Sequence, residues 1–70
     1  MKTVDITREP VELYKILKFE GLASSGAEAK LCVDDGLVTV NGDVETRRRR
    51  KIMSGDVIAF NGNELQIQLI

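Results

Sequence analysis

Two Asn-Gly pairs, Asn41-Gly42 and Asn61-Gly62, restrict the second half of this chain more than any other feature. Asn and Gly accept positive backbone φ angles at the two central positions of a type I′ turn, which is the tight turn that joins paired strands. The first pair separates residues 37–40 from residues 43–46, and the second follows the apolar segment Val57–Phe60. The sequence therefore predicts two β-hairpins between residues 37 and 69.

The first half predicts a short strand followed by a helix. Residues Lys2–Ile6 alternate polar and apolar side chains, which is typical of a half-buried strand. Leu13, Ile16 and Leu17 then follow the spacing of one helical face. We expect this helix to begin near Pro10, whose missing N–H is harmless in a first turn, and to end before a glycine at position 21.

A second helix is predicted from a capping box. Ser25 can accept from free backbone N–H groups, and Glu28 three residues later can reach back. Gly36 marks the end of this helix. Its apolar stripe consists of Ala29, Cys32 and Val33, and Ala27 and Leu31 on the other side are expected to be covered as well.

These elements follow the order β-αα-ββββ, which indicates an α+β fold. We expect a helix-turn-helix pair packed on a small, mainly antiparallel sheet of four to five strands. A chain of 70 residues holds one domain, residues 1–70, with a thin apolar core.

The composition argues against catalysis. The chain has no histidine, and its one cysteine, Cys32, has no neighbouring base in the sequence and is interpreted as a small core residue. Asp34-Asp35 is interpreted as a polar helix end. We expect no enzyme activity, no catalytic residues, no metal, no cofactor and no small-molecule substrate. No signal peptide is recognisable and the longest apolar run, Val57–Phe60, is far short of a membrane span, so a cytoplasmic protein without membrane contact is expected.

The charge is distributed unevenly along the chain. Residues 1–45 carry five basic and nine acidic side chains, whereas residues 46–70 carry five basic and two acidic ones. All five of the latter basic residues are contiguous: Arg47, Arg48, Arg49, Arg50 and Lys51. Arginine suits bidentate contact with phosphate, and an unbroken run of like charge favours a polyanion as partner.

This basic run cannot continue the preceding strand. Unbroken alternation from Val44 to Ile52 would direct Arg48 and Arg50 into the core, where unpaired charges are too costly. The strand is therefore expected to end or bulge near Thr46, which leaves the run on a loop or a twisted edge.

Several segments resemble the S-four RNA-binding domain, and in particular the small stand-alone YbcJ-like proteins. They are Gly21-Leu22-Ala23-Ser24-Ser25, Glu28-Ala29-Lys30, Gly36-Leu37-Val38-Thr39-Val40-Asn41-Gly42 and Gly55-Asp56-Val57-Ile58, and the likeness covers residues 11–60. The resemblance implies that the helix pair and the adjoining hairpin form an RNA-binding surface. Many members of the larger family carry an arginine after the capping serine, where this chain has Gly26.

The candidate RNA-binding residues combine these observations. The N-terminus of the second helix offers backbone N–H groups to a phosphate, and Gly26 allows close approach. The predicted set is Lys18, Ser25, Gly26, Lys30, Arg47, Arg48, Arg49, Arg50 and Lys51. We expect a monomer that binds structured RNA, such as ribosomal RNA or tRNA, by shape and phosphate contact.

The sequence has features in common with two other classes of protein. A protein-interaction module associated with the ribosome would use the apolar side chains of the second helix. A β-grasp sulfur carrier would share Val-Asn-Gly and Gly-Asp-Val segments, but it needs a flexible C-terminal Gly-Gly. This chain ends Gln66-Ile67-Gln68-Leu69-Ile70, which has no glycine.

Overall fold

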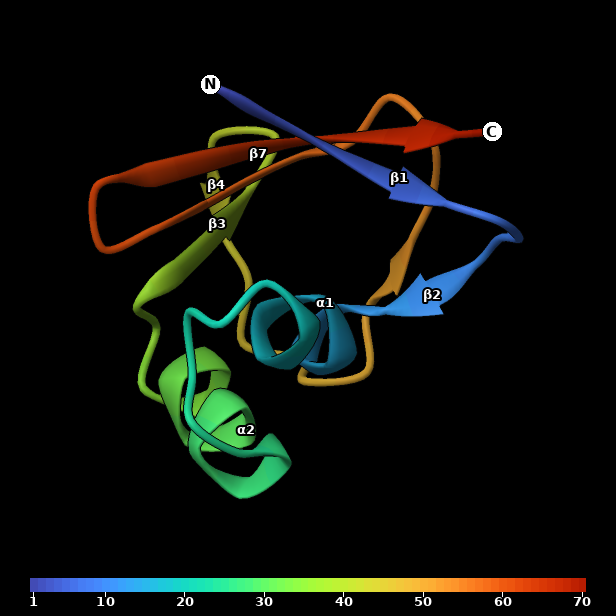
Figure 1. Cartoon of the computed structure of the whole chain (residues 1–70). Helices are drawn as coiled ribbons and strands as arrows, with labels where there is room; N and C mark the ends of the chain where they lie inside the picture. The colour runs from blue at the N-terminus through green and yellow to red at the C-terminus, as the bar shows by residue number, and fades with distance from the viewer.

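The computed structural model describes all residues, 1–70. It contains seven strands and two helices: β1 (Lys2–Ile6), β2 (Val11–Glu12), α1 (Leu13–Phe19), α2 (Gly26–Asp34), β3 (Val38–Val40), β4 (Asp43–Val44), β5 (Lys51–Ile52), β6 (Val57–Phe60) and β7 (Asn63–Leu69). Five strands form one sheet in the order β1-β7-β6-β3-β4, and β2 pairs with β5 alone. Both helices lie on one side of the five-stranded sheet, and the chain termini lie at the ends of the neighbouring strands β1 and β7 (Figure 1). The predicted fold class is confirmed.

Both predicted hairpins are present. Asn41 and Gly42 have φ angles of 54° and 89°, and Asn61 and Gly62 have 52° and 81°. These positive angles allow Val40 to pair directly with Asp43, and Phe60 with Asn63. A side chain on either glycine would be strained at these angles, which explains the residue type.

The first strand joins the sheet in a way that local sequence could not specify. β1 lies at the sheet edge and runs parallel to β7, the last strand, whereas all other strand pairs are antiparallel. Its Val4 and Ile6 are buried and Thr3 and Asp5 are exposed, as the alternation predicted. The first and last strands of the chain therefore lie side by side, and β1 forms one edge of the sheet.

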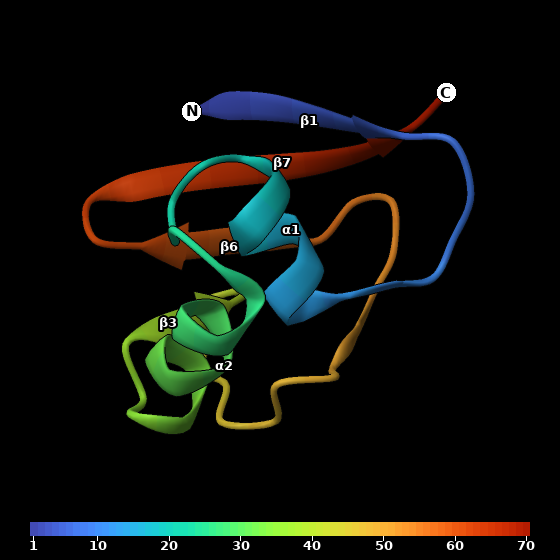
Figure 2. The same cartoon turned by 60° about the horizontal axis from the view of Figure 1, so that its bottom comes forward.

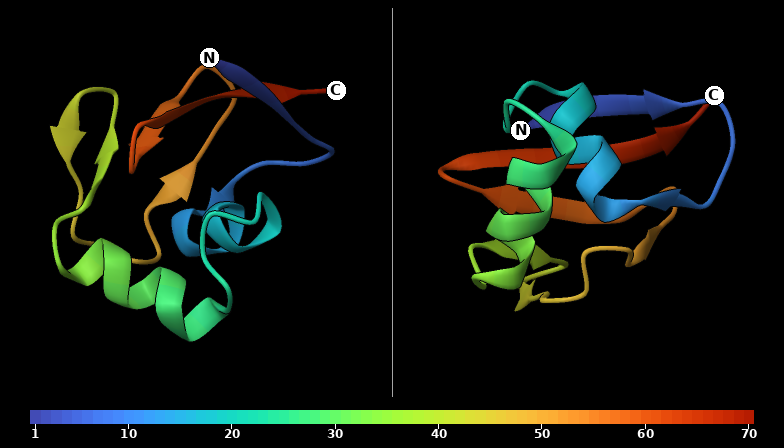
Figure 3. Two further views of the ribbon diagram at one scale, coloured as in Figure 1. Left: turned by 60° about the vertical axis from the view of Figure 1, so that its left-hand side comes forward. Right: turned by 90° about the horizontal axis from the view of Figure 1, so that it is seen from below.

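The core lies between the helices and the sheet. Its largest fully buried side chains come from every layer: Leu13, Ile16, Leu17, Val33, Val38, Ile52, Ile58, Leu65 and Ile67. The right-hand view in Figure 3 shows α1 and α2 lying over the strands. The buried residues of both helices belong to the same apolar cluster as those of the strands.

Two helix predictions need correction. The first helix begins at Leu13 and not near Pro10, because Val11 and Glu12 first form β2 against β5. The second helix buries one face only: Leu31 is 60% exposed and Ala27 is also exposed. The predicted cover over this second side is wrong because no element packs there. No helix is long and apolar enough to span a membrane.

Candidate nucleic-acid interface

The segment Arg47–Lys51, here called the cationic loop, is anchored to the start of α1. The residue that precedes α1, Glu12, makes no side-chain cap. Instead, the N–H groups of Leu13 and Tyr14 donate to the carbonyls of Arg50 and Arg48, at 2.9 and 3.1 Å. These carbonyls satisfy two of the free donors at the helix start. Figure 2 shows this segment, in yellow, passing below both helices.

The side chains of the loop point mainly to solvent. β4 ends at Val44, so the prediction that the strand stops near Thr46 is confirmed. Arg47, Arg48, Arg49 and Lys51 are exposed, and Arg50 is half-buried. A shallow depression of about 620 Å³ is lined only by Arg47, Arg49, Arg50 and Lys51. A surface hollow lined only by cations is suited to an anion.

Glu45 is the only charged residue in the buried set, and it organises two of these arginines. Its Oε2 accepts from Nε of Arg47 and its Oε1 accepts from Nη2 of Arg47, both at 3.0 Å. Nη1 of Arg50 donates to Oε1 at 2.7 Å. Hydrogen bonds from Arg47 and then from Arg50 lower the pKa of Glu45 from an ordinary 4.5 to about 2, against the opposing effect of burial. The carboxylate therefore stays charged at neutral pH.

Two further acids hold the middle of the loop. Nη2 of Arg48 donates to Oδ2 of Asp34 at 2.5 Å, which ties the loop to the C-terminal end of α2. Nε of Arg49 lies 3.6 Å from Oε2 of Glu12. Lys51 has no acidic partner within 4 Å. The five cations thus differ in how closely acidic side chains pair with them. Lys51, which has no acidic partner, and Arg49, which is loosely paired, are the most available to a ligand.

Tyr14 connects the cationic loop to the predicted residues on the helix pair. Its N–H is bonded to Arg48, and Nζ of Lys30 lies 4.7 Å from the centre of its ring. A Cβ built on Gly26 would lie 3.9 Å from the Tyr14 ring and 4.0 Å from Cδ of Lys18. The structure therefore brings Lys18, Gly26 and Lys30 together around Tyr14, next to the loop.

Sequence reasoning missed Tyr14 and the acids that hold the arginines. Tyr14 could have been found as the aromatic one helical turn before Lys18. Glu45 stands two residues before Arg47, a spacing that places both side chains on one side of an extended chain. No local signal marks Asp34 or Glu12 as partners, because their contacts join segments distant in sequence.

The capping box of α2 is present with one difference. The N–H of Glu28 donates to Oγ of Ser25 at 3.1 Å, as predicted. The Glu28 carboxylate, however, accepts from the N–H and hydroxyl of Ser24, not from the backbone of Ser25. The N–H groups of Gly26 and Ala27 have no acceptor within the protein. One carboxylate already lies at this helix end, which reduces its attraction for a second anion.

The single cysteine lies at the margin of the core. Cys32 is half-buried and packs against the core cluster, so the prediction of a core position is only partly correct. Burial, followed by the negative charges of Glu28 and Asp35, raises the pKa of its thiol. A raised pKa keeps the thiol protonated and weakly nucleophilic. No three histidine, cysteine or acidic side chains gather where they could hold a metal ion.

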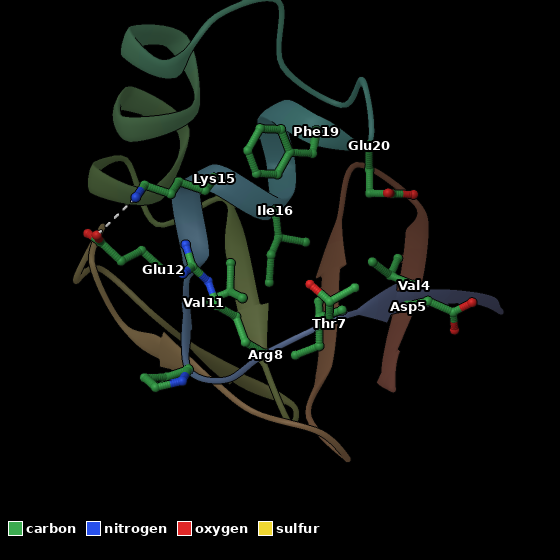
Figure 4. A pocket seen from close by; sticks show the side chains of 12 residues that line it. Val4, Asp5, Thr7, Arg8, Val11, Glu12, Lys15, Ile16, Phe19 and Glu20 are labelled. Atoms are coloured by element: carbon green, nitrogen blue, oxygen red, sulfur yellow. Dashed lines mark ion pairs between the residues drawn. The ribbon is translucent and has the colours of Figure 1, made fainter. Parts of the chain in front are cut away.

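A second depression, of about 390 Å³, lies between the β1–β2 connection and α1. Figure 4 shows side chains of both signs around it, among them Arg8, Lys15, Glu12 and Glu20. Nζ of Lys15 lies 3.4 Å from Oε1 of Glu12, and Nζ of Lys2 lies 2.9 Å from Oε1 of Glu20. The hollow is thus lined by acidic and basic side chains together, and it lacks the single-sign lining of the cationic loop.

The fold and this surface together define a small α+β module that presents a cationic loop beside a helix pair. The chain belongs to the S4 domain family, because the family model described as the S4 domain matches residues 4–68.

Two similar proteins, one of them with a solved structure, support this assignment. YbcJ of Escherichia coli (strain K12) is 44% identical over 68 residues, which cover 96% of this chain and 97% of YbcJ. The solution structure of E. coli YbcJ, described as revealing an αL motif involved in RNA binding, matches with a TM-score of 0.74 and 43% identity, over 97% of this chain and 87% of that one. RlbA of Bacillus subtilis (strain 168), whose name assigns it to ribosome maturation, is 34% identical over 59 residues, covering 84% of this chain and 83% of RlbA.

Proposed function

We propose that this protein is a non-catalytic RNA-binding module of the cytoplasm that grips phosphates with the cationic loop and the adjacent helix pair. The observation that carries the proposal is the hollow lined only by Arg47, Arg49, Arg50 and Lys51. It lies beside Lys30 and Lys18, which the Tyr14 contacts join to the loop. The RNA-binding motif described for E. coli YbcJ supports the same choice of ligand.

Structured RNA fits this surface better than an unpaired strand. Proteins that bind single strands stack bases on several exposed aromatic rings. Only three aromatic residues occur in this chain, and of these Tyr14 and Phe60 are half-buried while Phe19 alone is exposed. Arginine and lysine contacts to a folded backbone then provide the affinity, with little direct reading of bases. The likeness to RlbA favours ribosomal RNA over tRNA as the first target to test.

The salt dependence of binding tests this proposal. Arg49 and Lys51 are the loop cations least engaged by acids, so the double variant Arg49→Ala/Lys51→Ala removes charge with little effect on the fold. Each phosphate contact contributes about 0.7 to 0.9 to the slope of log affinity against log salt. The double variant should therefore lower the magnitude of that slope by about 1.4 to 1.8 on a ribosomal stem-loop.

Lys2→Ala is the matched control, because Lys2 lies on the edge strand β1 and pairs with Glu20. This variant should leave the slope unchanged. Equal slopes for the wild type and the double variant would contradict the proposal and favour a protein-interaction module. The exposed side chains of Leu31, Leu37 and Val44 would then be the surface to examine.

A further inference from the structure

Glu45 stands out as a carboxylate kept inside a surface that is proposed to bind anions. Its side chain is only 8% exposed, and its own N–H donates to the carbonyl of Val38 at 2.9 Å, which fixes it against β3. A buried carboxylate is costly unless strong donors surround it. A negative charge next to the loop also weakens the attraction of the loop for phosphate. We therefore looked for a contribution of Glu45 to binding that outweighs this repulsion.

The contacts of Glu45 show that it orders the backbone and the arginine side chains of the loop. Besides the two guanidinium bonds from Arg47, Oε2 accepts from the Arg47 backbone N–H at 3.0 Å. The same carboxylate holds Nη1 of Arg50, and the N–H of Arg50 donates to the carbonyl of Arg47 at 3.1 Å. One buried carboxylate thereby holds both ends of a tight turn, Arg47 through a two-bond fork and Arg50 through one donor.

The held guanidinium groups still have donors to offer. A guanidinium carries five N–H donors, and the fork to Glu45 uses two of those on Arg47. The side chain of Arg47 is 73% exposed, and it lines the cationic hollow together with Arg50. An arginine that is already oriented loses less conformational freedom when it meets a phosphate.

We propose that Glu45 is a positioning residue for RNA binding: its buried carboxylate orients Arg47 and Arg50 so that their remaining donors face a backbone phosphate. The inference rests on the proposed RNA-binding function. It makes a prediction opposite in sign to simple electrostatics. Removing a negative charge from a phosphate-binding surface should strengthen binding, whereas losing the orientation of two arginines should weaken it.

Glu45→Gln and Asp43→Asn form a matched pair for this test. Both replace a carboxylate by an amide on the same segment of chain, but Asp43 is exposed and has no basic partner within 4 Å. The probe is an RNA stem-loop with a duplex of about 16 base pairs, measured by fluorescence anisotropy over a range of salt concentrations. We expect Asp43→Asn to bind as tightly as the wild type or slightly more tightly, and Glu45→Gln to bind about tenfold more weakly.

The outcomes separate the two proposals. Binding by Glu45→Gln that equals or exceeds binding by Asp43→Asn would overturn the positioning role and leave RNA binding intact. A wild-type protein that does not bind the probe, or whose binding is insensitive to Arg49→Ala/Lys51→Ala, would instead refute RNA binding by this surface. If Glu45→Gln does not fold, as judged by circular dichroism, Glu45→Asp decides the question. It keeps the charge but withdraws the carboxylate by one methylene, so weakened binding supports positioning and unchanged binding overturns it.

Discussion

Glu45 shows how one residue can carry both stability and proposed function. Its charge is compatible with burial because Arg47 and Arg50 donate three side-chain hydrogen bonds to it. The hydrogen bonds between Arg47 and Glu45, followed by the negative charge of Glu45, raise the pKa of Arg47 in turn. If the Glu45 carboxylate lost its charge, Arg47 and Arg50 would lose their common hydrogen-bond acceptor. A neutral carboxylic acid would then occupy a site whose donors stabilise an anion.

The pH dependence of the unfolding free energy should show the contribution of Glu45 to stability. The pKa of Glu45 is lowered from 4.5 in an unfolded chain to about 2 in the fold. Its stabilisation is therefore complete above pH 4.5 and is lost as the pH falls through the interval down to about 2. One pKa unit corresponds to about 1.4 kcal/mol, and after allowance for solvent around the exposed Arg47 we expect a loss of about 2 kcal/mol.

Urea unfolding of the wild type and of Glu45→Gln between pH 7 and pH 2 measures this contribution. The difference in unfolding free energy between the two proteins should shrink as the pH falls below 4.5. Asp43→Asn should keep the acid-induced loss of the wild type. A constant difference between wild type and Glu45→Gln across the whole range would contradict the lowered pKa.

At the scale of elements, the two helices begin in different ways. α2 is capped locally, because Ser25 accepts from Glu28 three residues later. α1 has no side-chain cap and depends on the carbonyls of Arg48 and Arg50. The start of α1 and the backbone of the cationic loop are thus one structural unit, whereas the start of α2 would form without the loop.

Ser25→Ala tests the local cap and the proposed phosphate contact separately. Loss of an N-cap hydroxyl typically costs about 1 kcal/mol of stability, measurable by thermal or urea unfolding. Thr7→Ala is the control, since Thr7 is exposed and its hydroxyl makes no hydrogen bond in the structure. If the end of α2 also meets a phosphate, RNA affinity should fall as well. Unchanged affinity in a folded Ser25→Ala protein would restrict Ser25 and Gly26 to a structural role.

At the scale of the whole molecule, the edges of the sheet bear on the oligomeric state. The β4 edge has only two residues, and the β1 edge carries the charged side chains of Lys2 and Asp5. Short and charged edges disfavour pairing with a second copy.

We therefore expect a monomer in solution. Sedimentation equilibrium should give a mass near 7.8 kDa over a wide range of protein concentration. The mass should not change in Leu31→Ser, because Leu31 is exposed on the free side of α2. A mass near twice that value, reduced by Leu31→Ser, would show that this apolar side mediates dimerisation.

Sequence alone accounts for much of the fold. Asn41-Gly42 and Asn61-Gly62 determined their turns because positive φ angles are a local backbone property. Ser25 and Glu28 determined the start of α2, and the alternation in Lys2–Ile6 determined which side chains of β1 are buried. The exclusion of buried arginines also placed the end of β4 correctly.

Only the tertiary structure decided how these local pieces combine. The parallel pairing of β1 with β7, the docking of the loop carbonyls on α1, and the contact of Arg48 with Asp34 all join distant segments. In the sequence, the cationic loop consists of five equivalent charges, whereas in the fold Glu45, Asp34 and Glu12 distinguish them. The reason is physical: turns and caps depend on residues a few positions apart, but a charge acquires its partner and its burial only when the chain closes on itself.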